Sequence, residues 1–302
     1  MKNKVIFISG LSHVGSTLID FTLGTHPRII GLGEIYTALR PELNRINQNL
    51  TCSCGQPVDT CFFWKEAAKR LRPVLNAPMD RKYKIVLQTF NDLYGDDYIL
   101  VDSSKSIDAL KCLTRIPDLN LKIIHLLRDV RSWSISRIDY RKRKPENYTS
   151  RGFYINKLSY TFGKKIFLIG FLIPYITRRP SFYFLLWYFQ NKKAISYLNE
   201  NKLSFLQLGY DELGLRPGKM IDNIFSYIDQ NADECQSSSE SSKSHVLIGN
   251  PKKSDPERRR GILYDNRWMF RNEWLISAAL FRRIMKFNAD QVYGNIQKGN
   301  IW

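Results

Sequence analysis

The chain has 302 residues, of which 43% are hydrophobic and 13% aromatic, so it can bury one substantial core, and we expect a single domain over residues 1–302. Lys and Arg outnumber Asp and Glu by 46 to 28, and this excess favours anionic partners: nucleic acid, an anionic membrane surface, an anionic glycan or a polyphosphorylated ligand. The basic clusters are scattered along the chain, whereas a nucleic-acid arm gathers them in one block, so we expect no nucleic-acid partner. The first residues pass directly into a short apolar run without a signal-peptide pattern, which predicts a cytoplasmic protein.

The first predicted elements form a strand, a glycine-containing loop and a helix. The strand spans Val5–Ile8, the loop Ser9–Gly15 and the helix Ser16–Gly24. This order is typical of an α/β phosphate-binding unit, in which loop N–H groups and the positive end of the helix bind a phosphate. The two loop glycines have P-loop spacing, but Ser16 stands where an NTPase needs Lys, so ATP or GTP hydrolysis is disfavoured. A tight turn without any ligand is the alternative for the loop taken alone.

Two further strands are predicted to end in polar residues. They span Tyr98–Val101, before Asp102–Lys105, and Leu121–Leu127, before Arg128 and Asp129. The other predicted elements are a fourth strand at Leu203–Leu208, which leads into Gly209–Leu213, and helices at Phe63–Leu71, Arg81–Tyr94 and Ser181–Asn199. Because the carboxyl ends of parallel strands share one edge of a sheet, the polar tips can converge on one crevice. We therefore predict an α/β, P-loop-like three-layer fold with a central, mostly parallel sheet flanked by helices.

Two segments stand out by composition. Ile166–Gln190 is strongly apolar, but Pro174, Pro180 and two arginines interrupt it before the roughly 20 residues that a spanning helix needs. We expect a buried or interfacial helix pair there, so contact with a membrane surface stays open. Asp233–Ser244 is serine-rich and polar, which predicts a mobile loop.

Three of the five cysteines, Cys52, Cys54 and Cys61, lie close together in the sequence. A zinc site needs a fourth ligand, and no neighbouring histidine supplies one, so no metal site is predicted. These cysteines are expected to be thiols in a reducing compartment or to form a disulfide in an oxidising one. Two histidines, His26 and His125, are predicted to have structural roles.

A second anion site is predicted after the third strand. Arg128 stands at the strand tip, and Ser136 follows eight residues later, about two turns into the next helix. A guanidinium and a hydroxyl on the same side of a helix can bind a phosphate through charge-assisted hydrogen bonds. A surface salt bridge is the alternative role for Arg128. One phosphate loop and one separate Arg/Ser pair together suit a nucleotide with phosphates on two sugar positions.

These motifs resemble those of the sulfotransferases that use 3'-phosphoadenosine-5'-phosphosulfate (PAPS). His13–Thr17 resembles the 5'-phosphosulfate loop of that family, and Arg128 with Ser136 resembles its 3'-phosphate element. The chain is most similar to bacterial members resembling carbohydrate and protein-tyrosine sulfotransferases, and the further matches follow in the family's order: His26-Pro27, Gly33-Glu34, Cys52-x-Cys54-Gly55 with Cys61 and Trp64, Asp102–Lys105, Tyr210–Leu213, Gly249–Pro251 and Arg259–Ile262. Two departures are His13, where many members have Arg or Lys, and Val14, where a small Ser is usual.

The resemblance implies an enzyme with PAPS as donor, the bisphosphate PAP as product and no metal. It implies that Glu34 is the general base, and that Lys105 and His13 act at the bridging oxygen. The nucleotide-binding residues that it implies are Ser12, His13, Val14, Gly15, Ser16, Thr17, Arg128, Ser136, Tyr210, Asn250, Lys252, Lys253, Arg259, Arg260 and Gly261. Alternative roles stay open for Glu34, a helix cap or a salt bridge, and Lys111 is an alternative to Lys105.

The expected function is thus sulfuryl transfer to a hydroxyl or amine of an acceptor. A glycan or a small secondary metabolite fits the positive charge and the aromatic content, while the oligomeric state is not predicted. The alternative from another class is a non-catalytic module on a P-loop-like fold that binds nucleic acid or an anionic surface. That alternative explains the charge but not the spacing of Glu34, Arg128 and Ser136.

Overall fold

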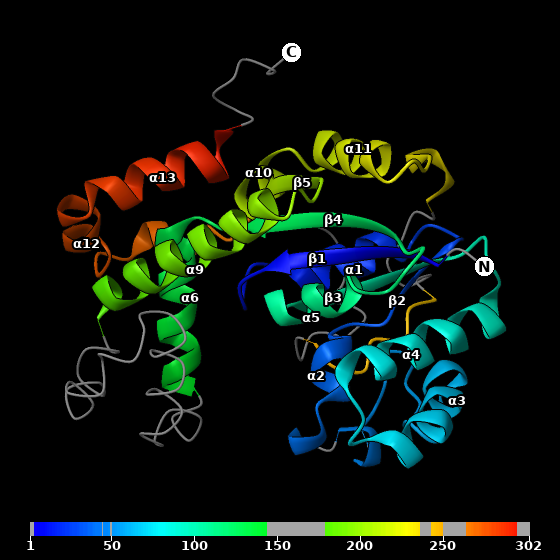
Figure 1. Ribbon diagram of the computed structural model, residues 1–302. Helices are drawn as coiled ribbons and strands as arrows, with labels where there is room; N and C mark the ends of the chain where they lie inside the picture. Colours follow the sequence, from blue (N-terminus) through cyan, green and yellow to red (C-terminus); the bar gives the residue numbers. More distant parts are fainter. Residues whose placement is uncertain are drawn as a thin grey trace. The chain divides into compact units, whose positions relative to one another are not determined.

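The computed structural model describes residues 3–43, 45–48, 50–143, 179–235, 243–249 and 264–294 (Figure 1). The chain divides into two compact units. Unit 1 comprises Met1–Leu126, Leu203–Leu206 and Pro217–Ile262, and unit 2 comprises Leu127–Lys202, Gln207–Arg216 and Leu263–Trp302. The expectation of a single domain over residues 1–302 stays a prediction.

Within the described residues, the central sheet has five strands in the order β2-β3-β1-β4-β5, and all of them run parallel. The strands are β1 (Lys4–Gly10), β2 (Ile29–Gly31), β3 (Ile99–Lys105), β4 (Asn120–Leu127) and β5 (Phe205–Gly209). The apolar side chains of β1 and β3 are continuously buried rather than alternating, as expected for parallel strands covered on both faces. The parallel sheet with flanking helices confirms the predicted α/β class.

Strand β3 is longer than the sequence predicts. The expected strand ends at Val101, but β3 continues through Lys105 because its polar residues find partners inside the protein. Asp102 is fully buried; its carboxylate accepts hydrogen bonds from the Tyr83 hydroxyl at 2.8 Å and from the Ser104 amide at 2.9 Å. The short strand β2 was not predicted, since three residues carry too little periodicity.

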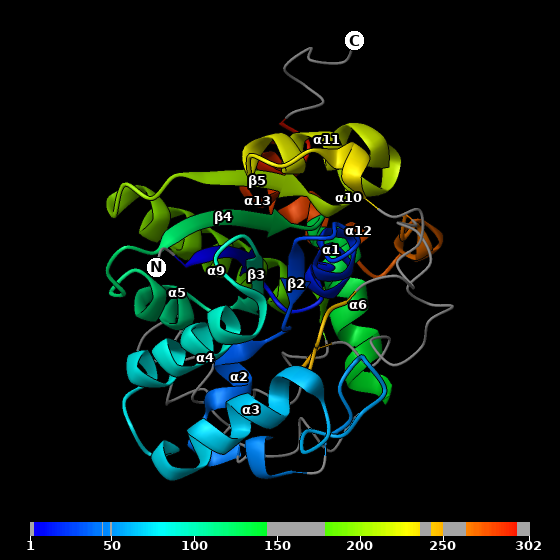
Figure 2. The same cartoon turned by 90° about the vertical axis from the view of Figure 1, so that its right-hand side faces the viewer.

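The helices of unit 1 pack on the sheet and on each other. They are α1 (Ser16–Leu23), α2 (Ile35–Leu39), α3 (Phe62–Leu71), α4 (Met79–Tyr94), α5 (Ile107–Leu113) and α11 (Pro217–Tyr227). Helix α1 contacts β2 and β3, α5 contacts β1, and α3 packs along α4 (Figure 2). The predicted helices over Phe63–Leu71 and Arg81–Tyr94 are therefore confirmed as α3 and α4.

Both histidines with predicted structural roles belong to unit 1. His125 is fully buried in β4 with its Nδ1 3.2 Å from the Ser9 hydroxyl, and burial lowers the pKa of its imidazole to about 4. His26 is also buried; its ring stacks on Phe225, and its Nε2 lies 3.4 Å from Glu234.

Unit 2 is built mainly from helices. They are α6 (Val130–Arg143), α9 (Pro180–Glu200), α10 (Tyr210–Leu215), α12 (Leu275–Leu280) and α13 (Arg282–Val292). Helix α9 packs against α6, α12 and α13, and the indole of its Trp187 donates a hydrogen bond to the Arg128 carbonyl at 2.9 Å. The predicted helix over Ser181–Asn199 is confirmed as α9.

Two expectations fall partly outside the described residues. The apolar segment Ile166–Gln190 is described only from residue 179, and the serine-rich segment Asp233–Ser244 is not described over 236–242. Among the helices that the structure describes, none combines the length and the apolar character needed to cross a bilayer.

Candidate functional site

The loop between β1 and α1 has the backbone of a phosphate-binding turn. Three of its residues have positive φ angles: Gly10 at 145°, His13 at 71° and Gly15 at 92°. Gly15 caps α1 in the left-handed conformation, and its carbonyl accepts the first helical hydrogen bond, from the Leu18 amide at 2.9 Å. Such alternation of handedness turns successive N–H groups toward one point, where an anion can bind.

Gly10 and Val14 explain why this loop keeps its shape. At Gly10 a Cβ atom would lie 2.5 Å from the Leu126 carbonyl oxygen, so only glycine fits beside β4. Val14 is fully buried, and its methyl group would lie 3.3 Å from the same Cβ atom. Val14 therefore anchors the loop to the core, while Ser12 is exposed and His13 partly exposed.

Glu34 and Lys105 form an ion pair at the edge of the sheet where this loop begins. The Lys105 ammonium lies 2.7 Å from Glu34 Oε1 and donates to the Ser103 carbonyl at 2.9 Å. In the register of β1 and β3, Lys105 is the partner of Ser9, the residue directly before Gly10. Lys105 has a φ angle of 66°, a conformation that costs a non-glycine residue about 1–3 kcal/mol and is concentrated at functional sites.

A third segment, Val246–Gly249, connects Glu34 to the start of α1. The Glu34 amide donates to the Ile248 carbonyl at 2.9 Å, and Gly33 forms a β-bridge with Ile248. A Cβ atom on Gly249 would lie 3.5 Å from Thr17 Oγ1. Unit 1 thus brings together the loop, Glu34 and Lys105.

Eight predicted residues form that group, and six others cannot be placed. Those together in unit 1 are Ser12, His13, Val14, Gly15, Ser16, Thr17, Glu34 and Lys105. Asn250, Lys252, Lys253, Arg259, Arg260 and Gly261 lie outside the described residues.

Behind the loop, α1 carries a buried carboxyl group that the sequence analysis did not single out. Burial raises the pKa of Asp20 to about 7, and the nearby charges of Asp102 and Lys105 act on it in opposite directions. Burial likewise raises the pKa of Asp102 to about 6. The one charged residue of the predicted helix, one turn after its start, was the signal that could have indicated Asp20.

Arg128, at the tip of β4, is held by side chains of unit 2. Its Nε donates to Ser132 Oγ at 2.9 Å, its terminal nitrogen pairs with Asp265, and its guanidinium lies 5.0 Å from the centre of the Tyr210 ring. Ser136 follows Ser132 by one turn on the same face of α6. The structure therefore brings together Arg128 and Tyr210, two predicted nucleotide residues, in one cluster.

Sequence analysis did not identify Asp265, which lies 137 residues from Arg128 in the chain. Burial alone would raise the pKa of this carboxyl, but hydrogen bonds from Arg267 and the charges of Arg128 and Arg267 outweigh it and lower the pKa to about 2. Asp265 is therefore a permanent anion at neutral pH, and it holds the Arg128 guanidinium in a fixed position.

Asp129 and Arg131, the two charged residues that follow Arg128, have structural roles. Asp129 is fully buried and accepts hydrogen bonds from Arg131, from Asn288 at 2.8 Å and from Tyr293 at 3.0 Å. Its amide donates to Asp211 at 2.7 Å. This network joins the end of β4 to α10 and α13, which fixes the backbone that carries Arg128.

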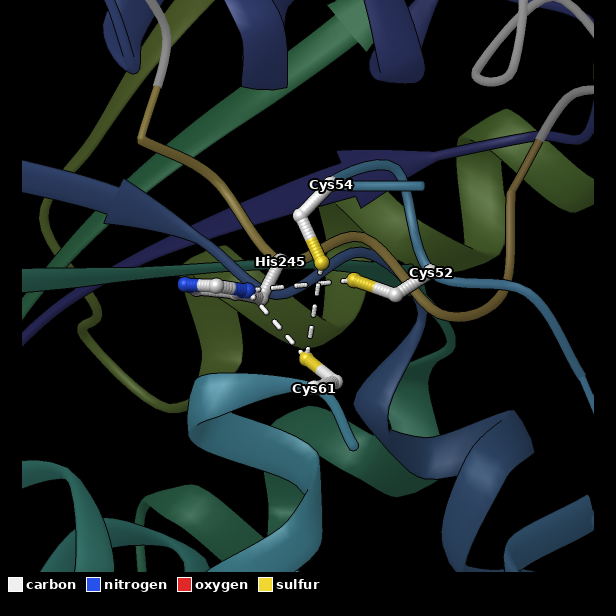
Figure 3. Close-up of side chains that lie close together, drawn as sticks. All are labelled: Cys52, Cys54, Cys61 and His245. Carbon is white, nitrogen blue, oxygen red and sulfur yellow. Dashed lines mark hydrogen bonds between the residues drawn. The ribbon is translucent and has the colours of Figure 1, made fainter. Parts of the chain in front are cut away.

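A separate cluster in unit 1 contains Cys52, Cys54, Cys61 and His245 (Figure 3). Sequence analysis found no histidine near these cysteines, but the fold brings in His245, 184 residues after Cys61. All five cysteines of the chain are free thiols, so none of them forms the disulfide that an oxidising compartment would favour. A hydrogen bond from Cys52 and, to a smaller extent, the hydrogen bond and charge of His245 lower the pKa of the Cys61 thiol to about 4.

Comparison with known proteins gives matches of structure only. No family model and no curated protein sequence matches the chain. Three similar solved structures are sulfotransferases. The sulfotransferase domain of the olefin synthase from Synechococcus PCC 7002 is 16% identical with a TM-score of 0.45, over 93% of this chain and 96% of that domain. One from Alicyclobacillus acidocaldarius is 12% identical with a TM-score of 0.44, over 89% of this chain and 100% of that chain.

The third, from Mycobacterium avium, is 14% identical with a TM-score of 0.42, over 78% of this chain and 66% of that chain. Identities of this size with TM-scores below 0.5 do not establish a shared activity. A functional assignment therefore depends on the residues of the site.

Proposed function

We propose that the chain is a sulfotransferase that moves the sulfuryl group of PAPS to a hydroxyl or amine of a glycan or small-molecule acceptor. The proposal is supported above all by one arrangement, the ion pair of Glu34 and Lys105 beside the loop that begins at Gly10. A carboxylate and an ammonium next to a phosphate-binding turn supply the base and the cation that transfer from a phosphosulfate requires.

In the proposed reaction, the loop amides and the N-terminus of α1 bind the 5'-phosphosulfate. The acceptor oxygen or nitrogen forms a bond to sulfur while the bond from sulfur to the bridging phosphate oxygen breaks. Glu34 takes the acceptor proton, and Lys105 stabilises the negative charge that develops on the bridging oxygen. His13, on the loop itself, would assist Lys105. The leaving group is a phosphate that cationic side chains can hold, so the transfer step itself calls for no metal.

The ion pair gives this mechanism an order of events. In the free protein Lys105 is 2.7 Å from Glu34, so each group neutralises the other. A bound phosphosulfate would compete for the ammonium, because charge-assisted hydrogen bonds to phosphate oxygens are strong. Glu34 would then lose its cationic partner and become a better proton acceptor when the donor is in place.

The 3'-phosphate of the nucleotide is assigned to Arg128 and Ser136, with Tyr210 packed against the guanidinium. Asp265 already occupies one side of Arg128, so the phosphate would be bound from the other side or would displace that pair. The acceptor itself is proposed only as a class, a glycan or a small molecule.

Nucleotide selectivity tests the donor. Calorimetric titration of the full chain with PAP should give clear binding, whereas ATP should bind weakly because Ser16 replaces the P-loop lysine. Equal affinities for PAP and ATP would contradict the proposal. Binding of PAP without any transfer activity would instead support a non-catalytic module.

The substitution Glu34→Gln tests the catalytic assignment. Transfer of labelled sulfate from PAPS to a panel of hydroxyl and amine acceptors should fall by about 10²–10⁴-fold, the usual contribution of a general base, while PAP affinity stays nearly unchanged. Glu42→Gln is the matched control, because Glu42 is an exposed glutamate paired with Arg40 in the same unit. Undiminished turnover in Glu34→Gln would remove Glu34 from the mechanism.

A further inference from the structure

The cysteine and histidine cluster of unit 1 has the composition and spacing of a metal site. One ligand atom from each of Cys52, Cys54, Cys61 and His245 lies within 4.8 Å of the other three. The sulfurs of Cys54 and Cys61 are 3.7 Å apart, and His245 Nδ1 is 3.2 Å from Cys61 Sγ and 3.9 Å from Cys52 Sγ. Figure 3 shows the three sulfurs and this nitrogen directed toward a common point.

These distances match the edges of a zinc tetrahedron. With Zn–S bonds of about 2.3 Å and Zn–N bonds of about 2.0–2.1 Å, tetrahedral angles separate two sulfurs by about 3.8 Å and sulfur from nitrogen by about 3.5 Å. A disulfide would require its two sulfurs to be about 2.05 Å apart. The sulfurs of Cys54 and Cys61 are thus too far apart for a bond but suitably placed to share a metal ion.

The backbone around the cluster holds the ligands in place by hydrogen bonds that do not involve them. Ser53, between the first two cysteines, donates its hydroxyl to the Ser244 carbonyl and accepts from the Val246 amide, both at 2.9 Å. Its own amide donates to the Val246 carbonyl at 3.0 Å. Three hydrogen bonds therefore join the residue between Cys52 and Cys54 to the residues on either side of His245.

The third cysteine is fixed by a helix and a tryptophan. Cys61 is the N-cap of α3, and its amide donates to the Pro57 carbonyl at 2.8 Å. One turn into α3, the Trp64 indole donates to the His245 carbonyl at 2.6 Å. Cys52 and Cys54 lie on a tight turn closed by the Gly55 amide, with Gly55 at a φ angle of 85°.

We propose that Cys52, Cys54, Cys61 and His245 bind one structural zinc ion. Four protein ligands leave no open coordination position, which is typical of structural rather than catalytic zinc sites. A set of three thiolates and one imidazole in tetrahedral arrangement selects zinc over the harder cations that prefer oxygen ligands. Cys54 is exposed and gives the ion a path of entry.

The zinc site would also support the proposed catalytic glutamate. His245 lies three residues before Ile248, whose carbonyl accepts a hydrogen bond from the Glu34 amide. The His245 amide donates a hydrogen bond to the Gly31 carbonyl at 2.7 Å. Metal binding would thus hold the segment that positions Gly33 and Glu34. Zinc binding itself is independent of the sulfotransferase assignment, because the metal can be measured without any substrate, whereas the support of a catalytic Glu34 rests on the proposed function.

Metal analysis of the purified full chain tests the site. The protein should contain about one zinc ion per chain, and Cys54→Ser should lower that content to near zero after dialysis against a weak chelator. Cys54 is the best position because its side chain is exposed and the substitution should leave the core intact. Cys112→Ser and Cys235→Ser are the matched controls, since both cysteines lie outside the cluster, and they should keep the metal.

Cobalt substitution and a thiol count separate the remaining outcomes. Co²⁺ in this site should show thiolate-to-metal charge transfer and intense tetrahedral d–d bands, and His245→Ala should change the d–d bands. A purified chain that holds no metal and shows five reactive thiols on denaturation would overturn the proposal. A count of three reactive thiols would also overturn it, because one disulfide removes two of the five. Unchanged zinc content in Cys54→Ser would also overturn it.

Discussion

At Gly31 the backbone of β2 passes so close to helix α1 that a side chain has no room. A Cβ atom there would lie 1.7 Å from Asp20 Oδ1 and 2.9 Å from Ser244 Oγ. Ser244 Oγ already accepts a hydrogen bond from the Gly31 amide. Because the Asp20 carboxyl is buried, it cannot swing into solvent to make space. This glycine therefore fixes the distance between β2 and α1, the helix that follows the loop from Gly10 to Gly15.

The substitution Gly31→Ala should lower the free energy of unfolding by about 1–3 kcal/mol, the usual cost of overpacking a core. Urea denaturation followed by tryptophan fluorescence would measure the change. Gly218→Ala is the control, since Gly218 lies in α11 with open space around it, and alanine there should be neutral or slightly stabilising. Equal stabilities of the two variants would contradict the close approach at Gly31.

Lys105 combines an unfavourable backbone conformation with a side chain for which we propose a catalytic role. Both Lys105→Ala and Lys105→Gly remove the ammonium, so both should abolish sulfuryl transfer. They should differ in stability, because glycine accepts the φ angle of 66° while alanine does not, and the glycine variant should be more stable by about 1 kcal/mol. Denaturation curves that coincide would show that this backbone position is not strained.

At the scale of elements, the proposed donor site lies on β1, the loop that follows it and α1. Gly15→Ala would place a Cβ atom at a left-handed φ angle of 92° directly at the start of α1. Either the residue stays strained, at a cost of about 1–2 kcal/mol, or the loop changes shape and its N–H groups no longer converge. We expect PAP affinity to fall at least tenfold, a loss of about 1.4 kcal/mol of binding free energy.

Calorimetric titration of Gly15→Ala with PAP would measure that loss, again with Gly218→Ala as the control. Circular dichroism should show that the helical content is unchanged, because α1 is only one of several helices. PAP binding at the wild-type level would mean that the nucleotide does not use this loop.

The strands and helices of unit 1 show which parts of the fold the sequence can predict and which it cannot. The strand, the loop and α1 were predicted because their signals are local: an apolar run, two spaced glycines and a helical pattern within about 25 residues of each other. The continuation of β3 through Asp102–Lys105 was missed because it depends on partners such as Tyr83 that only the fold supplies.

Site residues divide in the same way. Glu34, Lys105, Arg128 and Ser136 could be predicted as site residues because they stand at fixed offsets from predicted strands or within motifs that resemble a known family, and their roles stay predictions. Asp265 and His245 could not be predicted, since each reaches its partners across more than a hundred residues of chain. Contacts between residues so far apart in the chain depend on the topology of the fold, and no local sequence pattern predicts them.

At the scale of the whole molecule, the dependence of stability on pH is a sum of opposing contributions. Burial raises the pKa of Asp20 to about 7, that of Asp102 to about 6 and, with the charge of Asp129, that of Asp211 to about 7, so these groups favour the folded state most at low pH. Burial lowers the pKa of His125 to about 4, and this group favours the folded state at higher pH. A single pH profile therefore cannot assign the effect to one residue.

A comparison of the wild type with Asp20→Asn isolates one of these contributions. In the unfolded chain Asp20 titrates near 3.8, and in the folded protein near 7, so between these values the folded state binds one proton more than the unfolded state. Stability from Asp20 is thus fully present below about pH 4 and is lost as the pH rises to about 7, by roughly 4 kcal/mol at 1.36 kcal/mol per unit.

The asparagine of the variant is neutral throughout this range and has nearly the same shape as aspartate. The two proteins should therefore have similar unfolding free energies near pH 4, and the variant should become progressively more stable than the wild type up to about pH 7, with a constant difference above it. Urea denaturation of both proteins at several pH values measures this difference, in which the contributions of Asp211 and His125 cancel, while Asp102 stays coupled to Asp20 through its charge. A difference that does not change with pH would show that the Asp20 carboxyl is ionised in the folded protein.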